Sequence, residues 1–565
     1  MRARPIFVAG GVLLGAATVA AWWTARAVDR RLSEELTRRG AALGVTVREV
    51  RFSWLRPLRL DGVTVDRGDG PRVTIDSVGV DWRLGGARDV RAHVRHVSLE
   101  GVHLARGPVV VDWPLAELDV LSWSGGAGEE RLHVRQPAGG ELQVQVRTAE
   151  AGREATLVLT RFDASNARVR WGAEPVLAPG VWTGRLSVAH TGDRLATDAA
   201  LSAEAVRLSL PRGLALGNGE YGAPTAVAIG WTASREGPSI DVRHLAARLG
   251  GLELSGHGQL RGPGEDRTVE LEMQARSDLG AALQTTALRL PPALPVAPGD
   301  ALGTASFDVS VQGPLARPAD LHIVPHLRYD STPQVAQKLE FLRRPFRYHP
   351  PDTEGITLDV RDGSPDFIRL SDVPPLFLRT LLISEDAGFY GHPGIDVAEI
   401  PHAWATNVER GTSARGASTI TQQLVKNLFL STDKSYGRKI EEAALALLVD
   451  AGVPKTRILE IYLNVIEWGP GLYGLVPAAR HYFGKTPGEL TPREMVFLIC
   501  LIPSPVRYHQ AHAAGHVGPG MDQLMANLLA KLRSVDALTD DAYFDALTEE
   551  LRFQPESGPP EGAPL

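Results

Sequence analysis

Several segments in the C-terminal part of the chain combine carboxylates with basic and amide side chains at helical spacing. Residues 376–386 follow a Pro-Pro pair that favours a helix start, and Glu385 extends an apolar stripe that includes Phe377 and Leu381. Burial of a carboxylate raises its pKa towards the range of a general base. Glu385 is therefore a candidate general base, but by itself a glutamate at a helix end is more often solvated or caps a neighbour.

A second segment, residues 416–430 (GASTITQQLVKNLFL), indicates a helix with a polar face. Thr419 and Gln422 have the spacing of a capping box, and the free N–H groups at a helix start attract phosphate. The polar face would carry three side chains spaced three and four residues apart, Gln423, Lys426 and Asn427. This polar face could meet a pyrophosphate and sugar hydroxyls, but the segment by itself is better explained as an ordinary capped amphipathic helix.

Two further segments place charged and amide groups on single helix faces. Arg438 and Lys439 lie four and three residues before Glu442, so the three side chains can meet, as they would in a common surface ion pair. Glu460 and Asn464 are also four residues apart, and we expect them to brace the site.

In this order, the segments resemble the four motifs of the family 51 glycosyltransferases, the peptidoglycan glycosyltransferases. Residues 385–396 (EDAGFYGHPGID) have the form of the first motif, and the second segment matches the second motif almost residue for residue. Residues 438–442 fit the third motif and make Glu442, rather than Glu441, its glutamate. Residues 455–464 (KTRILEIYLN) resemble the fourth motif.

Residues 467–484 are also similar to the monofunctional branch of that family. The resemblance covers about residues 376–508. Ala417 stands where a glycine is common, and Pro401 falls early in an expected helix, but neither departure removes a functional group.

The resemblance implies a mainly α, lysozyme-like domain acting on undecaprenyl-pyrophosphate substrates, with the growing strand as donor and lipid II as acceptor. Glu385 would deprotonate the acceptor 4-hydroxyl as it attacks the anomeric carbon, inverting an α-linked pyrophosphate into a β-1,4 bond. The predicted site residues are Glu385 and Glu442 for catalysis, Ser418, Thr419, Gln423, Lys426, Asn427, Arg438 and Lys439 for substrate, and Asp386, Phe389, His392, Glu460 and Asn464 for support. No cofactor or metal site is predicted, although a divalent cation such as Mg²⁺ could neutralise pyrophosphate.

Two other functions remain open at the level of sequence. A lytic transglycosylase or muramidase-like hydrolase would cleave strands, but it needs no pyrophosphate site. An envelope lipid-binding or tethering protein could carry an inactive glycosyltransferase module. A transpeptidase is not expected: residues 431–434 (STDK) and 485–487 (KTP) only partly match its motifs, and the roughly 80 residues after Lys485 are too few for that domain.

The N-terminus predicts attachment to a membrane. Residues 6–25 contain no charged side chain and are long enough to span a bilayer, which needs about 20 residues. A cleaved signal peptide is the alternative, because residues 25–27 have a small-x-small pattern. The arginines that follow favour a cytoplasmic location for the rest of the chain. The wall-building chemistry requires the opposite, so we expect a single-pass protein of the cytoplasmic membrane with its catalytic domain on the periplasmic side.

The remainder of the chain predicts a multidomain protein of 565 residues. Strand-like alternation in residues 43–315 indicates a β-rich region that resembles the AsmA-like envelope proteins, and the pattern around Gly62 recurs around Gly101. We expect the glycosyltransferase domain at 335–515, a helical segment at 516–553 and a disordered tail at 554–565. The net charge of -6 gives no sign of nucleic-acid binding. Other cell-wall synthesis proteins are further candidate partners.

Overall fold

In the computed structural model the chain forms two compact units, Met1–Arg289 with Ser306–Pro325 and Leu290–Ala305 with His326–Leu565. The structure describes residues 44–53, 56–66, 72–82, 94–126, 128–209, 222–286, 291, 293–297, 299–350, 353, 355–410, 418–430, 436–505 and 510–555. Within these ranges no helix has both the length and the apolar character needed to cross a membrane. The predicted anchor at residues 6–25 lies outside the described residues.

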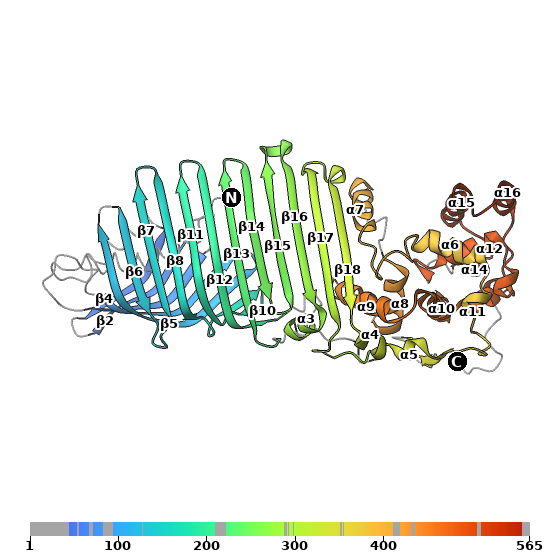
Figure 1. Ribbon diagram of the computed structural model, residues 1–565, viewed down its shortest axis with the longest axis horizontal. Coiled ribbons are helices and arrows are strands. Elements are labelled where there is room, and N and C mark those ends of the chain that lie inside the picture. The colour runs from blue at the N-terminus through green and yellow to red at the C-terminus, as the bar shows by residue number, and fades with distance from the viewer. Residues whose placement is uncertain are drawn as a thin grey trace. The chain divides into compact units, whose positions relative to one another are not determined.

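The first unit is built around long antiparallel strands (Figure 1). These are β1 (Val45–Ser53), β2 (Arg56–Val65), β3 (Arg72–Trp82), β4 (Val94–Arg106), β5 (Val109–Gly126), β6 (Glu129–Arg135), β7 (Glu141–Ala149), β8 (Gly152–Asp163), β9 (Arg168–Trp171), β10 (Glu174–Ala178), β11 (Val181–Thr191), β12 (Arg194–Leu208), β13 (Thr225–Glu236), β14 (Ser239–Leu249), β15 (Leu252–Arg261) and β16 (Thr268–Asp278). A short helix, α3 (Leu279–Thr286), follows β16. The predicted β-rich region is therefore confirmed. Strand β17 (Gly303–Pro314) ends just before the predicted limit at residue 315, and β18 (His322–Ser331) lies beyond it.

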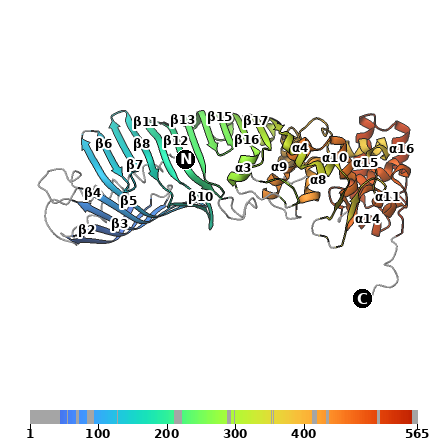
Figure 2. The same ribbon diagram turned by 60° about the horizontal axis from the view of Figure 1, so that its bottom comes forward.

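Most strands pair with their neighbours in sequence, as expected for hairpins. The exception is the short pair β9 and β10, which lies between β5 and β12, while β8 pairs directly with β11. The N-terminal half of β5 pairs with β9 and its C-terminal half pairs with β6. Strands β2 to β4 turn away from the row that runs from β6 to β16 (Figure 2).

The recurring pattern around Gly62 and Gly101 has a structural reason. Leu60 and Val63 are buried in one cluster, although regular alternation would send residues three apart to opposite faces. Gly62, between them, has a φ of +65°, and a Cβ there would lie 2.9 Å from the Cβ of Arg48. Gly101 in β4 repeats this conformation with a φ of +62°. Glycine adopts this left-handed backbone without the penalty of other residues.

The second unit is mainly helical, as predicted. Its helices are α4 (Pro333–Lys338), α5 (Glu340–Arg343), α6 (Pro375–Glu385), α7 (Glu399–Arg410), α8 (Ile420–Phe429), α9 (Tyr436–Gly452), α10 (Lys455–Val465), α11 (Leu475–Phe483), α12 (Pro492–Leu501), α14 (Gln510–Ala513), α15 (Pro519–Ser534) and α16 (Asp540–Thr548). Two small hairpins, β19 (Phe346–Tyr348) with β20 (Leu358–Val360) and β21 (Glu467–Gly469) with β22 (Leu472–Tyr473), complete it. The sequence predicted a β-rich part and a helical part, and the structure contains both.

The C-terminal helices belong to the same packed unit as the motif-bearing helices. Arg493 of α12 donates hydrogen bonds to the carbonyl oxygens of Ala546 and Leu547 in α16, at 2.9 and 3.0 Å. Gln554, predicted as the start of a disordered tail, donates its N–H to the carbonyl of Tyr482 at 2.8 Å. The predicted boundary at residue 554 therefore falls too early, because this backbone group has a partner in the unit. Residues 556–565 lie outside the described residues.

Candidate active site

Helix α6 places Glu385 at its C-terminal end. Pro375 opens the helix, and the apolar stripe predicted from sequence is present, because Phe377 and Leu381 are fully buried. Lys531 of α15 donates to the carbonyl of Ile383 at 2.7 Å, which satisfies one of the carbonyl groups that a helix end leaves unpaired. The carboxylate of Glu385 is thus carried by a helix with a buried face and a C-terminal end held by Lys531.

The half-buried carboxylate of Glu385 accepts two hydrogen bonds. Gln423 Nε2 donates to its Oε2 at 3.0 Å, and Ser384 Oγ donates to its Oε1 at 3.0 Å. Burial raises the pKa of Glu385 above its ordinary value of 4.5, and these two hydrogen bonds oppose that effect in part. The negative charge of Asp386 raises the pKa further. A carboxylate in this setting is suited to accept a proton near neutral pH.

The capping box predicted at the start of α8 is confirmed. Thr419 Oγ1 accepts from the N–H of Gln422 at 3.1 Å, and Gln422 Oε1 accepts from the N–H of Thr419 at 3.0 Å. Thr419 is buried and its hydroxyl also donates to the carbonyl of Gly394 at 2.6 Å. Thr419 was predicted to line the substrate site, and in the structure its hydroxyl holds the helix start and the loop after α6.

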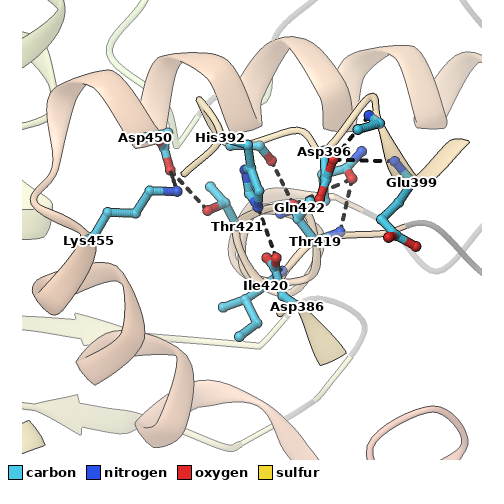
Figure 3. A network of polar contacts seen from close by, with 12 residues as sticks. Asp386, His392, Asp396, Glu399, Thr419, Ile420, Thr421, Gln422, Asp450 and Lys455 are labelled. Carbon is cyan, nitrogen blue, oxygen red and sulfur yellow. Dashed lines mark hydrogen bonds and ion pairs between the residues drawn. The ribbon is translucent and has the colours of Figure 1, made fainter. Parts of the chain in front are cut away.

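Residues of the first motif hold the same helix start (Figure 3). Asp386 Oδ2 accepts from the N–H of Ile420 at 2.9 Å, and His392 Nε2 lies 2.9 Å from Asp386 Oδ1. Asp396 Oδ1 accepts from the N–H of Ala398 at 3.0 Å. Asp386 thus connects the segment after Glu385 to the first turn of α8, while the Asp396 contact is local to the segment before α7.

Asp386, His392 and Asp396 offer metal-ligand atoms that all lie within 4.8 Å of one another. Each of the three nevertheless has a hydrogen bond to protein. We therefore interpret the cluster as a scaffold that joins two helices. Phe389 has a similar role: its ring is fully buried, and Lys455 Nζ lies 4.4 Å from the ring centroid.

The structure brings Ser418, which lies just before the N-cap of α8, together with Lys439 and Glu442 of α9. Lys439 Nζ donates to Ser418 Oγ at 2.7 Å and forms an ion pair with Glu442. Glu442 is 3% exposed, whereas Glu441 is less buried, which agrees with the choice of Glu442 as the motif glutamate. Ser418 and Glu442 hold the ammonium of Lys439 at the start of α8. The free N–H groups at a helix start favour phosphate binding.

The other predicted substrate residues are close in sequence to Ser418 and Lys439, but they differ in exposure and contacts. Lys426 is exposed on α8. Asn427 is half-buried, and its backbone carbonyl accepts a hydrogen bond from the hydroxyl of Tyr348 in β19. The side chain of Arg438 lies outside the described residues.

The fourth motif braces the segment before α6. Asn464 Oδ1 accepts from the N–H of Ile368 at 2.9 Å, and its Nδ2 donates to the carbonyl of Ile368 at 2.9 Å. Glu460 Oε1 accepts from the N–H of Leu370 at 3.1 Å and Arg457 pairs with its other oxygen. These contacts fit the support role predicted for Glu460 and Asn464.

One residue that sequence reasoning missed contacts the site from α10. The hydroxyl of Tyr462 donates to Gln423 Oε1 at 2.9 Å, so a chain of hydrogen bonds runs from Tyr462 through Gln423 to Glu385. Tyr462 lies between Glu460 and Asn464 in sequence and points to a different neighbour. Helical spacing groups Glu460 with Asn464 on one face of α10, but it does not show which helix the side chain of Tyr462 meets.

The segment that partly matched a transpeptidase motif has a structural explanation. Lys485 Nζ contacts both carboxylate oxygens of Glu494, at 2.7 and 2.8 Å. Thr486 opens a capping box with Glu489. Residues 431–434, the other half of that motif, lie outside the described residues.

Known proteins are similar to this chain over the region that contains the candidate site. The sequence model of the Transglycosylase family matches residues 355–528, which include α6 to α12. A biosynthetic peptidoglycan transglycosylase of Nitrobacter winogradskyi is 40% identical over 191 residues, 33% of this chain and 82% of that protein. The chain therefore belongs to the family of biosynthetic peptidoglycan transglycosylases. The family resemblance inferred from the four motifs is confirmed.

Other relatives align over a smaller share of their length. The protein of the same name from Nitrosomonas eutropha is 46% identical over 134 residues, 24% of this chain and 54% of that protein. The one from Herminiimonas arsenicoxydans is 40% identical over 150 residues, 26% of this chain and 65% of that protein. The chain thus spans about half to two thirds of these relatives. The crystal structure of penicillin-binding protein 1A from Haemophilus influenzae shares 18% identity, covers 37% of this chain and 21% of that chain, and has a TM-score of 0.19.

Proposed function

We propose that this chain is a peptidoglycan glycosyltransferase that polymerises lipid II into β-1,4-linked glycan strands for the cell wall. The observation that supports this most strongly is a pair of groups that both contact α8 or its start. Glu385, a half-buried carboxylate with a raised pKa, is bonded to Gln423 of α8, and a buried glutamate holds Lys439 at Ser418, just before α8. General-base catalysis and stabilisation of a leaving pyrophosphate are the two requirements of the reaction.

The reaction proceeds in one displacement. Glu385 takes the proton of the acceptor 4-hydroxyl, whose oxygen forms a bond to the anomeric carbon of the donor. The bond from that carbon to the pyrophosphate oxygen breaks, and the lipid pyrophosphate leaves with the electron pair. Lys439, held by Glu442 and Ser418, and the exposed Lys426 supply positive charge for the leaving group. The proposed residues require no cofactor, and a divalent cation such as Mg²⁺ can add charge neutralisation at the pyrophosphate.

We also propose that the protein works at the cytoplasmic membrane. A lipid-linked substrate keeps its isoprenoid in the bilayer while its sugars reach the enzyme. Two large exposed side chains, Tyr390 within the first motif and Ile400 shortly after it, are 60% and 49% exposed and are candidates for lipid contact. The uncharged residues 6–25 would supply the anchor, and the catalytic unit would lie on the periplasmic side.

This location can be tested with reporter fusions placed after Gly70. A phosphatase that is active only outside the cytoplasm should be active in the fusion, and a cytoplasmic fluorescent reporter at the same position should be dark. The physical reason is substrate access, because the sugars of flipped lipid II lie on the outer face of the membrane. A bright reporter with an inactive phosphatase would refute both the topology and the wall-building role.

A two-substrate assay separates synthesis from cleavage. Purified protein is incubated in parallel with lipid II and with preformed, uncross-linked glycan strands. We expect consumption of lipid II and no fragments from the strands, because a pyrophosphate site serves the synthetic reaction only. Release of short fragments without consumption of lipid II would identify a hydrolase or lytic enzyme, and no reaction in either arm would favour an inactive binding module.

A further inference from the structure

A single chain of hydrogen bonds connects three helices of the catalytic unit. Tyr462 in α10 donates its hydroxyl to Gln423 Oε1 at 2.9 Å. Gln423 in α8 donates its Nε2 to Glu385 Oε2, at the end of α6, at 3.0 Å. Tyr462 is fully buried, so its hydroxyl has no access to solvent as an alternative partner. The Tyr462 hydroxyl is therefore connected to the proposed base through one amide.

The direction of these two hydrogen bonds follows from the chemistry of Glu385 and Tyr462. An ionised carboxylate only accepts hydrogen bonds, so Glu385 requires the NH₂ group of Gln423. The amide oxygen of Gln423 then points away from Glu385 and requires a donor, since an unpaired buried oxygen costs about 1–3 kcal/mol. The Tyr462 hydroxyl provides that donor. If the amide rotated by half a turn, its oxygen would face the carboxylate and the two would repel each other.

Tyr462 stays a donor at every pH at which such an enzyme works. Burial, together with the nearby charges of Glu385 and Asp386, raises the pKa of the Tyr462 hydroxyl well above its ordinary value of 10.0. A neutral hydroxyl that donates to an amide oxygen also polarises the amide, which strengthens the N–H donation at the other end. The two bonds in the chain thus support each other.

We infer that Tyr462 is a positioning residue for glycosyl transfer, whose hydroxyl fixes the amide of Gln423 and, through it, the carboxylate of Glu385. The inference rests on the proposed function of Glu385 as the general base. It also gives Gln423 a role different from the substrate contact predicted from sequence, because its amide is bonded to the base on one side and to Tyr462 on the other.

The test is Tyr462→Phe, which removes only the hydroxyl. We expect kcat for lipid II polymerisation to fall about ten-fold, the scale of one hydrogen bond, with KM within about two-fold. The acid limb of the pH–rate profile should move to higher pH, because the Gln423 hydrogen bond lowers the pKa of Glu385 and is weakened in the variant. An unchanged kcat and acid limb would overturn the inference.

Tyr482→Phe is the matched control. Tyr482 is also fully buried, and its hydroxyl donates to the carbonyl of Trp468 at 2.9 Å, so the same atom is lost at a similar buried site. Both variants should show similar losses in thermal stability, but only Tyr462→Phe should shift the acid limb. Equal shifts in both variants would mean that the effect is a general loss of stability, which contradicts a positioning role.

A double-mutant cycle tests whether Tyr462 acts through Gln423. In a Gln423→Ala background, adding Tyr462→Phe should lower kcat by less than about two-fold, because the connecting amide is already absent. A full ten-fold loss in that background would overturn the inference.

A direct titration distinguishes failure of this inference from failure of the proposed function. If wild-type protein does not polymerise lipid II, the proposed function fails. The pKa of the Glu385 carboxyl can still be measured by carbon-13 NMR in wild type and in Tyr462→Phe. A higher pKa in the variant supports the connection, and identical values in the two proteins would refute it.

Discussion

Glu385→Gln should abolish lipid II polymerisation, with a loss of at least about 10³-fold in kcat, within the range that general-base catalysis contributes. Glutamine has nearly the shape of glutamate but cannot accept a proton, so the acceptor hydroxyl keeps its hydrogen. The substituted side chain can still meet Gln423 and Ser384, so the fold of α6 should remain. The rate is measured from consumption of labelled lipid II, and folding from circular dichroism.

The pH dependence of the wild-type enzyme is a second test of Glu385 as the base. The base must be ionised to act, so the rate should rise with pH through the pKa of Glu385. Burial raises that pKa, so the acid limb should lie above the ordinary glutamate value of 4.5. Glu550→Gln, a change at an exposed carboxylate of the same unit, is the control and should leave the rate and profile unchanged. A Glu385→Gln enzyme with normal turnover would exclude this residue as the base.

Glu442→Gln should lower kcat about 10²-fold, the scale observed when one preorganised electrostatic contact is removed from a reacting group. Glu442 is 3% exposed and holds Lys439, whose ammonium also meets Ser418. Neutral glutamine pairs more weakly with that ammonium, so the positive charge is less well fixed where the pyrophosphate leaves. Steady-state kinetics with lipid II give the measurement.

The neighbouring glutamate makes the comparison specific. Glu441→Gln removes the same charge one residue earlier, on a different face of α9, and should change kcat by less than about two-fold. Lys426→Ala should behave like Glu442→Gln, since both are proposed to serve the pyrophosphate. Equal losses in the two glutamate variants would show that the total charge of α9, and not the contact with Lys439, sets the rate.

The sequence was most informative where local rules decide the structure. Alternating residues predicted strands such as β16, and the spacing of Thr419 and Gln422 predicted the start of α8, because strand faces and helix caps depend on near neighbours. The boundaries were less accurate. Strands continue to Ser331 and Gln554 is bonded to Tyr482, and both depend on partners that are distant in sequence.

In the candidate site, too, local patterns could be predicted, but contacts between distant residues could not. Motifs identified Glu385, Lys439 and Glu442, and the structure places Lys439 and Glu442 in contact. The partner of Gln423 could not be predicted, because its amide meets Glu385 and Tyr462 only after α6, α8 and α10 have packed. Thr419 was assigned to substrate from its motif, whereas its burial and its bond to Gly394 appear only in the folded chain.

The most direct test of the proposed function is the product that the purified wild-type protein makes from lipid II in detergent or liposomes. We predict glycan strands joined by β-1,4 bonds, with one undecaprenyl pyrophosphate released for each bond formed, as shown by gel separation and mass spectrometry. Lipid II that remains unchanged beside a folded protein, or products without released pyrophosphate lipid, would contradict the account.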